Sequence, residues 1–184
     1  RLARLLNDRQ AALLRRGLIG LEKESLRVAP EGSLALTPHP AALGSPLTHP
    51  FITTDYSEAL LEFITPPLAG LTTALEFLRD TQQFVYHKLE EEYLWGTSMP
   101  CVVAGERSIP IARYGHSNLG MMKTIYRRGL GHRYGRMMQV IAGVHFNWSL
   151  NEDLWPAYRL IEGRVCGLRD FRDRMYMGQV RNLQ

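Results

Sequence analysis

Cysteine is scarce in this chain, and long apolar runs are absent. Cys101 and Cys166 are the only cysteines among 184 residues. Two cysteines make neither a disulfide framework nor the ligand pattern of a structural zinc site, so they favour a reducing compartment over secretion. No apolar stretch approaches the roughly 20 residues that a membrane-spanning helix needs, and the first residues lack the apolar core of a signal peptide. We therefore expect a cytoplasmic protein without a membrane partner.

The sequence also lacks a phosphate-binding loop of the GxxxxGK type, internal repeats and low-complexity tracts. A nucleotide would therefore have to bind through another arrangement. The chain does not begin with Met, and it stops within a helix-like pattern at residues 181–184. Its length suits one hydrophobic core. We expect a single, incomplete domain that belongs to a longer protein.

Charge is distributed unevenly along the chain. Residues 1–100 hold 9 Lys and Arg against 12 Asp and Glu, a net charge of −3, whereas residues 101–184 hold 13 against 6, a net charge of +7. Such a basic half suits either nucleic acid or a pocket for a polyanion. No aromatic residues alternate with its arginines as in a base-stacking platform, so we expect no nucleic-acid partner.

Hydrophobic periodicity predicts an α+β fold. The expected N-caps are Thr72 or Thr73 for a helix that runs to residue 95, and Ser117 or Asn118 for a helix over residues 119–134. A reverse turn is expected at residues 30–33, and loops at residues 37–50 and 98–118. The predicted elements are helices over residues 2–16, 72–95, 119–134 and 168–184, a short helix within 151–167, and strands over 18–28, 51–64 and 138–150.

Two acidic residues, Glu22 and Glu24, lie two positions apart inside the alternating segment 18–28. In a strand, such side chains point to the same face and lie roughly 6–7 Å apart. Like charges at that distance raise each other's pKa unless a cation lies between them. The pair therefore indicates a proton or a divalent metal, and the alternative interpretation is an edge strand with a solvated face.

The other two predicted strands also carry polar groups on one face. In residues 51–64, Glu58 and Glu62 share a face with Tyr56, Leu60 and Ile64, and Asp55 lies near the start. In residues 138–150, Gly143 would let a neighbouring group approach the backbone closely. The polar face of this strand holds Gln139, His145 and Asn147, and its expected core face holds Val140, Ala142, Val144, Phe146 and Trp148.

Several carboxylates with one imidazole are hard ligands that suit Mg²⁺ or Mn²⁺. Mg²⁺ held by carboxylates usually also binds substrate phosphates. The basic segment with Arg127, Arg128 and Arg133 would complement such phosphates. Each feature has an ordinary alternative, because a strand histidine is often a hydrogen-bonded core residue and an Arg-rich helix is often a solvated face. These patterns alone indicate a candidate divalent-metal site and leave the function open.

Six segments resemble motifs of the bacterial glutamate–cysteine ligases, also called γ-glutamylcysteine synthetases. They are GLEKESLRV at residues 20–28, LTH at 47–49, ITTDYSEALLEFITP at 52–66, SMPC at 98–101, YR at 126–127 and GVHFN at 143–147. Their order and spacing match over nearly the whole chain. The resemblance implies that residues 1–184 form the N-terminal part, roughly the front third, of the catalytic domain of such a ligase.

The resemblance implies an ATP-dependent ligase that makes the first bond of glutathione biosynthesis. In that family ATP phosphorylates the γ-carboxylate of glutamate, and the amine of cysteine attacks the acyl phosphate. The implied fold is an antiparallel sheet, flanked by helices, that forms part of a glutamine-synthetase-like funnel. The implied partners are glutamate, cysteine, ATP and the remaining C-terminal part of the enzyme, without which this chain would have weak or no activity.

Site residues follow from the resemblance position by position. The implied ligands of Mg²⁺ (or Mn²⁺) are Glu22, Glu24, Asp55 and Glu62. The implied catalytic residues are His145 and Arg127, and the implied cofactor-binding residues are His145 and Asn147. The cysteine pocket would include Tyr56, Tyr126 and Leu130, and the glutamate site would include Gln139 and Ile141. An alternative with the same fold is a ligase that acts on a different amine.

Overall fold

The computed structural model describes residues 2–7 and 11–183 and contains two compact units. The larger unit comprises residues 20–147, and the smaller unit comprises residues 1–19 and 148–184. That both belong to one catalytic domain stays a prediction. None of the helices in the described ranges is long and apolar enough to cross a membrane.

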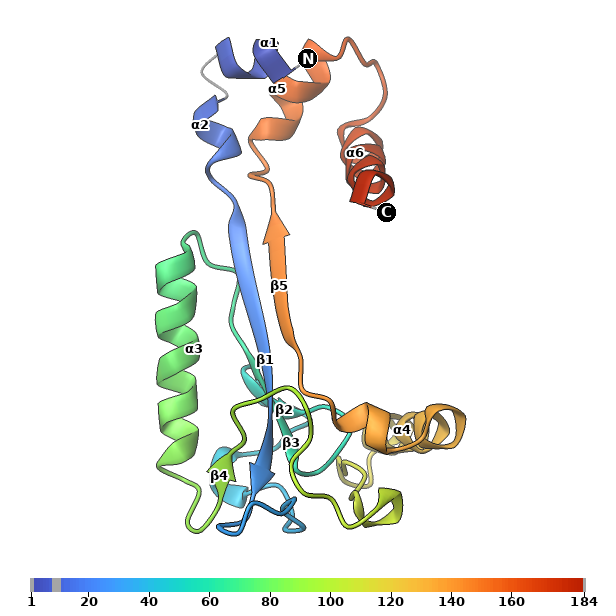
Figure 1. Cartoon of the computed structure of the whole chain (residues 1–184). Helices are drawn as coiled ribbons and strands as arrows, with labels where there is room; N and C mark the ends of the chain where they lie inside the picture. Colours follow the sequence, from blue (N-terminus) through green and yellow to red (C-terminus); the bar gives the residue numbers. More distant parts are fainter. Residues whose placement is uncertain (1, 8–10, 184) are drawn as a thin grey trace. The chain divides into compact units, whose positions relative to one another are not determined.

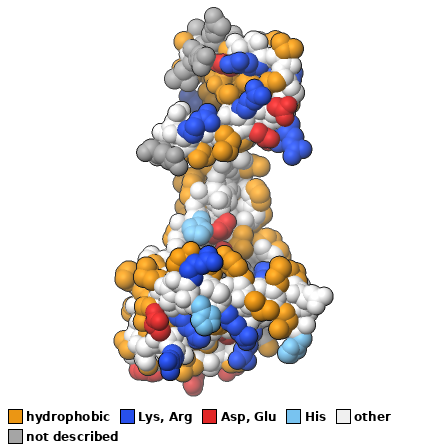
Figure 2. Space-filling view, turned by 90° about the vertical axis from the view of Figure 1, so that its right-hand side faces the viewer, with side chains coloured by type: hydrophobic (Ala, Val, Ile, Leu, Met, Phe, Trp, Pro, Cys, Tyr) orange, Lys and Arg blue, Asp and Glu red, His pale blue; other side chains and the backbone are white. Residues whose placement is uncertain are grey.

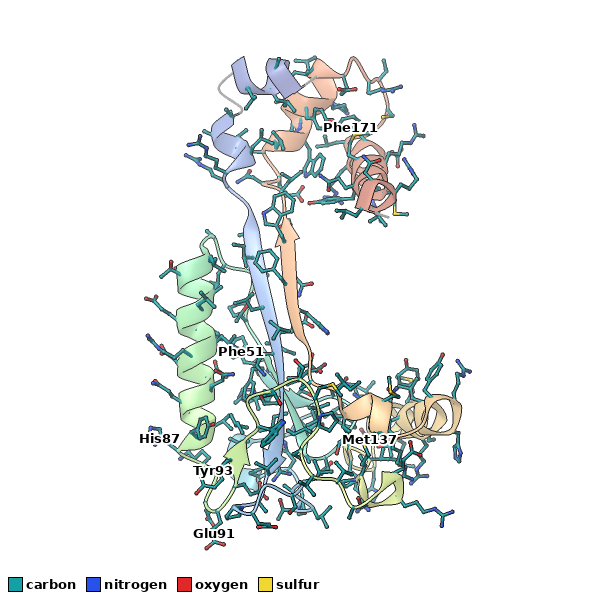
Figure 3. The ribbon with its side chains drawn as sticks, in the orientation of Figure 1. Phe51, His87, Glu91, Tyr93, Met137 and Phe171 are labelled. Atoms are coloured by element: carbon teal, nitrogen blue, oxygen red, sulfur yellow. The ribbon has the colours of Figure 1, made fainter. Side chains whose placement is uncertain are left out.

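The smaller unit is helical. Its helices are α1 (Leu2–Asn7), α2 (Ala11–Leu14), α5 (Leu154–Ile161) and α6 (Leu168–Leu183). The predicted helix over residues 2–16 is thus described as two short helices, and residues 8–10 lie outside the described ranges. Phe171 is buried, and its ring centroid lies 5.4 Å from that of Tyr158 (Figure 3). The two predicted C-terminal helices are confirmed within the described residues.

An open antiparallel sheet with flanking helices forms the framework of the fold, as predicted (Figure 1). The strand order is β2-β3-β1-β4, and β5 also pairs with β1. The predicted strand over residues 18–28 is confirmed with the same bounds. The strands are β1 (Leu18–Val28), β2 (Ile52–Thr54), β3 (Leu60–Ile64), β4 (Tyr93–Leu94) and β5 (Val144–Ser149).

Residues 51–64 form a hairpin, so the prediction of one continuous strand was wrong. The N–H of Asp55 donates to the carbonyl oxygen of Leu60 at 3.0 Å. The N–H of Leu60 donates to the carbonyl oxygen of Ser57 at 2.9 Å. The Ser57 hydroxyl also donates to the carbonyl oxygen of Pro110 at 2.8 Å. These bonds close a turn that periodicity does not reveal. Tyr56 and Glu58 therefore lie in the turn and not on a strand face with Glu62.

Helix α3 (Leu71–Tyr86) is shorter than the predicted helix over residues 72–95. Its N-cap is Gly70, which makes no side-chain capping bond, so the prediction of Thr72 or Thr73 was wrong. Beyond α3, the short strand β4 pairs with β1, with Arg27 opposite Leu94. This pairing overrides the helical propensity of the intervening residues, because tertiary contacts outweigh local preference.

One face of the sheet packs on α3. Leu61, Phe63 and Ile52 form a buried cluster with Val85 of α3. Phe51 lies between the strands and α3 (Figure 3), and its ring meets that of Phe77 edge-on at a centroid distance of 4.9 Å. The opposite face of the central strands is therefore the face left for polar groups.

Helix α4 (Asn118–Tyr134) begins as predicted. The N–H of Gly120 donates to the Ser117 hydroxyl at 3.1 Å, which satisfies one of the free donors of the first turn. The predicted turn at residues 30–33 is also confirmed, since the N–H of Gly32 donates to Ala29 and Gly32 has φ of 84°. The loops hold short 3₁₀ turns at Ala41–Leu43 and Glu106–Ser108.

The predicted strand over residues 138–150 is a strand only from residue 144 onward. Met137–Val140 form a 3₁₀ turn, and Figure 3 shows Met137 beside α4. Val140 and Ala142 are buried, but Val144, Phe146 and Trp148 are 62%, 58% and 46% exposed. The prediction that all five side chains form one core face was therefore wrong for the three on β5.

Phe63 and Phe146 give a test of this assignment. We expect Phe63→Ala to destabilise the chain by about 3–5 kcal/mol, because its side chain is fully buried. Phe146→Ala should change the free energy of unfolding by about 0.5 kcal/mol or less, as exposed substitutions usually do. Urea unfolding of both variants measures the difference, and equal losses would contradict the exposed position of Phe146.

Candidate functional site

Glu24 of β1 lies directly opposite Glu62 of β3. Side chains that face each other across antiparallel strands have Cβ atoms about 4.5–5.5 Å apart. Glu22 pairs with Ile64 in the same register, so its side chain lies on the same face of the sheet. Three carboxylates therefore share one face of two neighbouring strands, and the shared face expected for Glu22 and Glu24 is confirmed.

The other face of these strands belongs to the core against α3. Lys23 lies opposite Phe63, and Ser25 lies opposite Leu61. The Lys23 ammonium donates to the carbonyl oxygen of Glu24 at 2.5 Å and to the Ser25 hydroxyl at 3.0 Å. Burial lowers the pKa of Lys23. The lysine nearest in sequence therefore forms no ion pair with the carboxylates.

Burial and mutual repulsion shift the protonation of this acidic face. Burial, followed by the charges of Asp55, Glu24 and Glu22, raises the pKa of Glu62 to about 7, and His145 opposes this shift. Burial also raises the pKa of Glu24, with a further contribution from Asp55. Among the described residues, no Lys or Arg forms an ion pair with Glu24, Asp55 or Glu62. A proton or an added cation would relieve the repulsion.

Strand β5 brings two polar side chains to Glu22. The Nδ1 atom of His145 lies 3.0 Å from one carboxylate oxygen of Glu22, and the Asn147 amide donates to the other at 2.8 Å. The hydrogen bond to Glu22 raises the pKa of His145. Alternation along β5 explains why both residues reach one carboxylate, since positions two apart point to the same side.

Gly143 makes the close approach that its position predicts. Its N–H donates to the Glu24 carboxylate at 2.6 Å, and its carbonyl oxygen accepts from the Glu24 N–H at 2.9 Å. A Cβ atom at this position would lie 3.0 Å from Nε2 of His145. A larger residue would therefore crowd His145.

Asp55 reaches the acidic face from the turn between β2 and β3. The Tyr114 hydroxyl lies 2.7 Å from the carbonyl oxygen of Thr54 and 3.1 Å from that of Asp55. The Nε of Arg127 also donates to the carbonyl oxygen of Asp55, and its guanidinium lies 4.8 Å from the centroid of the Tyr114 ring. Arg127, expected as a catalytic residue, thus contacts the main chain that carries Asp55.

Sequence reasoning missed Tyr114. The residue is buried, with 5% of its surface exposed, yet it lies in an irregular segment between the 3₁₀ turn at Glu106–Ser108 and α4. Its only sequence signal is a single aromatic residue in a loop rich in Pro and Gly. Such a signal does not show which main-chain carbonyl oxygens the Tyr114 hydroxyl will contact.

The expected substrate residues are only partly brought together. Tyr56 is buried in a hydrophobic cluster against which Leu130 packs. Tyr126 on α4 is 63% exposed. Gln139 lies in the 3₁₀ turn after α4, and Ile141 follows it with 37% of its surface exposed. In the described residues, no hydrogen bond or ring contact joins Tyr126 to the other four.

Within residues 2–7 and 11–183, no group of three or more carboxylate, imidazole or thiol side chains is arranged closely enough to hold a metal ion. The side-chain contacts explain this spacing. Both oxygens of Glu22 bond to residues of β5, and one oxygen of Glu24 bonds to Gly143. Each Glu22 oxygen accepts one hydrogen bond and keeps a lone pair for a metal, since metal-ligating carboxylates are commonly hydrogen-bonded as well.

The raised pKa of Glu62 predicts a pH dependence of stability in the absence of divalent metal. In the unfolded chain this carboxyl has a pKa near 4.5, so the folded state binds the proton more tightly. The stabilising contribution is complete below pH 4.5 and is lost as the pH rises through about 7. We expect the melting temperature in EDTA to fall between about pH 5.5 and about pH 8.

Glu62→Gln should flatten this pH dependence, because it removes the titrating group. The matched control is Glu76→Gln on the exposed surface of α3, which should keep the wild-type slope. Thermal melting of the three proteins over a pH series measures the effect. An unchanged slope in Glu62→Gln would contradict the assignment.

Solved structures of known proteins share this fold. A crystal structure of glutamate–cysteine ligase from Francisella tularensis in complex with AMP superposes with a TM-score of 0.78 and 39% identity, over 81% of this chain and 30% of that one. A bifunctional glutathione synthetase from Pasteurella multocida gives a TM-score of 0.87 and 34% identity, over 98% of this chain and 23% of that one. The open sheet with its flanking helices therefore has the fold of the matched parts of these two proteins.

The family comparison is more specific. The family model described as glutamate–cysteine ligase matches residues 2–184, and this chain belongs to that family. The resemblance inferred from the sequence motifs is thus confirmed.

Curated relatives named glutamate–cysteine ligase are about half identical to this chain. The protein from Alcanivorax borkumensis is 52% identical over 184 residues, which are 100% of this chain and 35% of the relative. The protein from Pseudomonas putida is 56% identical over 172 residues, which are 94% of this chain and 33% of the relative. The chain therefore spans about a third of the length of these relatives.

Proposed function

We propose that this chain supplies part of the active site of an ATP- and metal-dependent ligase that joins the γ-carboxylate of glutamate to the amine of cysteine. The observation that carries the proposal is the acidic face on which Glu24 and Glu62 stand opposite each other, with Glu22 and Asp55 beside them. Membership of the glutamate–cysteine ligase family supports the choice of reaction. The reaction would be the first step of glutathione biosynthesis.

The acidic face suits Mg²⁺ or Mn²⁺ in its chemistry. Hard divalent cations prefer carboxylate oxygens, and the candidate ligands are Glu22, Glu24, Asp55 and Glu62. The repulsion that raises the pKa of Glu62 is what a cation would relieve. When bound, the metal would supply positive charge against the phosphates of ATP and the transferred phosphoryl group.

The residues around the acidic face have separate roles in this proposal. His145 is exposed, and its bond to Glu22 favours the protonated imidazole, which suits contact with a phosphate. Asn147 fixes the orientation of Glu22. Arg127 holds the turn that carries Asp55, so we assign it a positioning role. Gly143 fixes one oxygen of Glu24 and leaves the other free to bind a ligand.

The nucleotide and the two amino acids are assigned from the relatives and from the placement of the expected substrate residues. The Francisella tularensis enzyme was solved in complex with AMP, which supports ATP as the nucleotide here. We propose that Tyr56, Leu130 and the exposed Tyr126 contribute to the cysteine pocket, and that Gln139 and Ile141 line the glutamate site. Further residues would have to come from the rest of the protein, because this chain spans a third of its relatives. We further propose that the enzyme is cytoplasmic.

Glu24→Gln tests the acidic face in the complete protein. The substitution keeps the size of the side chain and removes its charge. We expect turnover to fall by about a hundredfold or more, because changing even the partner of a metal ligand commonly costs 10–100-fold. Phosphate release with glutamate, cysteine and Mg·ATP measures turnover, and Mn²⁺ titration measures metal binding. Glu76→Gln is the control, and full activity in Glu24→Gln would contradict the proposal.

The same assay separates the alternative ligase from the proposed one. Cysteine should support phosphate release more efficiently than other small amines at equal concentration. If another amine is the better substrate while Glu24→Gln remains inactive, the metal site stands and the assignment of cysteine is wrong.

Arg127→Met tests whether this arginine positions Asp55 or contacts the reacting phosphate. We expect weaker Mn²⁺ binding but a kcat that recovers at saturating metal, because the contact is to the main chain of Asp55. Arg133→Met on the same helix is the control. A kcat that stays low at saturating metal would instead assign Arg127 a direct catalytic role.

A further inference from the structure

A second charged feature of the larger unit is a cavity lined by arginines. Its volume is about 380 Å³, and it lies between the 3₁₀ turn at Glu106–Ser108, the segment 109–113 and helix α4. No acidic residue lines it. Figure 2, viewed from the α4 side, shows Lys and Arg side chains gathered on this unit. The charged lining residues are Arg107, Arg113, Arg128 and Arg136. We call this cavity the arginine pocket.

No ion pair within the described residues neutralises the arginine pocket, although Glu106 lines an adjoining cavity together with Arg107, Arg128 and Arg136. Glu58 lies close by, but its two oxygens accept from the main-chain N–H groups of His39 and Arg113, at 3.0 and 2.7 Å. Glu58 is therefore occupied by main-chain donors. Like charges that line a concave surface concentrate positive potential and attract anions.

The arginine pocket is built on well-packed backbone. Arg136 donates to the carbonyl oxygen of Ile109, which is fully buried, at 3.0 Å. Arg113 lies between two buried residues, Ala112 and Tyr114. The Thr124 hydroxyl links α4 to the same segment through the carbonyl oxygen of Ala112 at 3.3 Å. Rigid support of this kind holds charged groups in place before a ligand arrives.

The chemistry of the lining selects a class of ligand. A guanidinium group presents paired N–H donors that match the oxygens of a phosphate or a carboxylate. Four such groups favour a ligand with several negative charges, and the hydroxyls of Ser108 and Thr124 add polar lining. The volume lies in the lower part of the range of small-molecule sites, about 300–1,000 Å³. A compact anion with more than one phosphoryl group meets these conditions.

We propose that the arginine pocket binds a small anion with two or more phosphoryl groups, such as inorganic pyrophosphate. This binding does not require a divalent metal, because the arginines themselves supply the opposing charge. It also does not depend on the proposed ligase activity. No hydrogen bond or ion pair in the described residues joins the four arginines to Glu22, Glu24, Asp55 or Glu62.

Calorimetric titration of the complete protein with pyrophosphate, in EDTA and at fixed ionic strength, tests the proposal. EDTA removes metal-dependent binding at the acidic face from the measurement. We expect saturable binding to one site. The double variant Arg107→Gln with Arg128→Gln should weaken it by about tenfold or more, because it removes two guanidinium groups that make charge-assisted hydrogen bonds to the anion. Arg136 is left unchanged because it supports the backbone.

The control is Arg133→Gln, which removes the same charge from α4 at an exposed position outside the arginine pocket. It should bind pyrophosphate as the unmodified protein does. Equal weakening in the control, or no saturable binding at all, would overturn the proposal. Citrate, titrated in parallel, should bind more weakly, and stronger citrate binding would overturn the phosphoryl assignment. Loss of ligase activity in other variants would leave these outcomes unaffected.

Discussion

The direct opposition of Glu24 and Glu62 across β1 and β3 is the constraint on which the candidate site depends. Like charges in this arrangement repel, and a slip of register would separate them. The slip is prevented because the other face of β3 buries Leu61 and Phe63 against α3. Moving the strand by one residue would turn those side chains toward the acidic face. Packing on one side of the sheet thus imposes the carboxylate cluster on the other.

The neighbouring elements then hold the carboxylates in place, and among the described residues Glu22 alone of the four has a cationic partner, His145. Main-chain donation from Gly143 fixes Glu24, and the side chains of β5 fix Glu22. The Nε of Arg127 donates to the main-chain carbonyl oxygen of Asp55 and not to the Asp55 carboxylate. Part of the negative charge therefore survives folding, because Glu24, Asp55 and Glu62 have no ion-pair partner among the described residues. This residual charge is what makes a cation-dependent function physically reasonable.

The sequence was informative where local patterns decide the structure. The alternation in residues 18–28 predicted β1 and the shared face of Glu22 and Glu24, and the Ser117 cap predicted the start of α4. The hairpin at residues 51–64 was not predictable, because the Ser57 hydroxyl bonds to Pro110, far along the chain. The regular alternation after residue 138 led to the wrong prediction of a buried face. Alternation indicates which side chains share a face but not whether other residues cover that face. Asp55 joined the other carboxylates through its place near the start of a predicted strand, and the motif resemblance then implied the same ligand role for it.

The uneven charge of the sequence resolves into two local features of opposite sign. The acidic face draws its carboxylates from residues 22–62, and the arginine pocket draws its guanidinium groups from residues 107–136. Helix α4 serves both features, because successive helical residues point about 100° apart. Arg127 therefore turns toward the Asp55 backbone while its neighbour Arg128 lines the arginine pocket. Two adjacent arginines that composition treats as equivalent thus acquire different chemical roles from helical geometry alone.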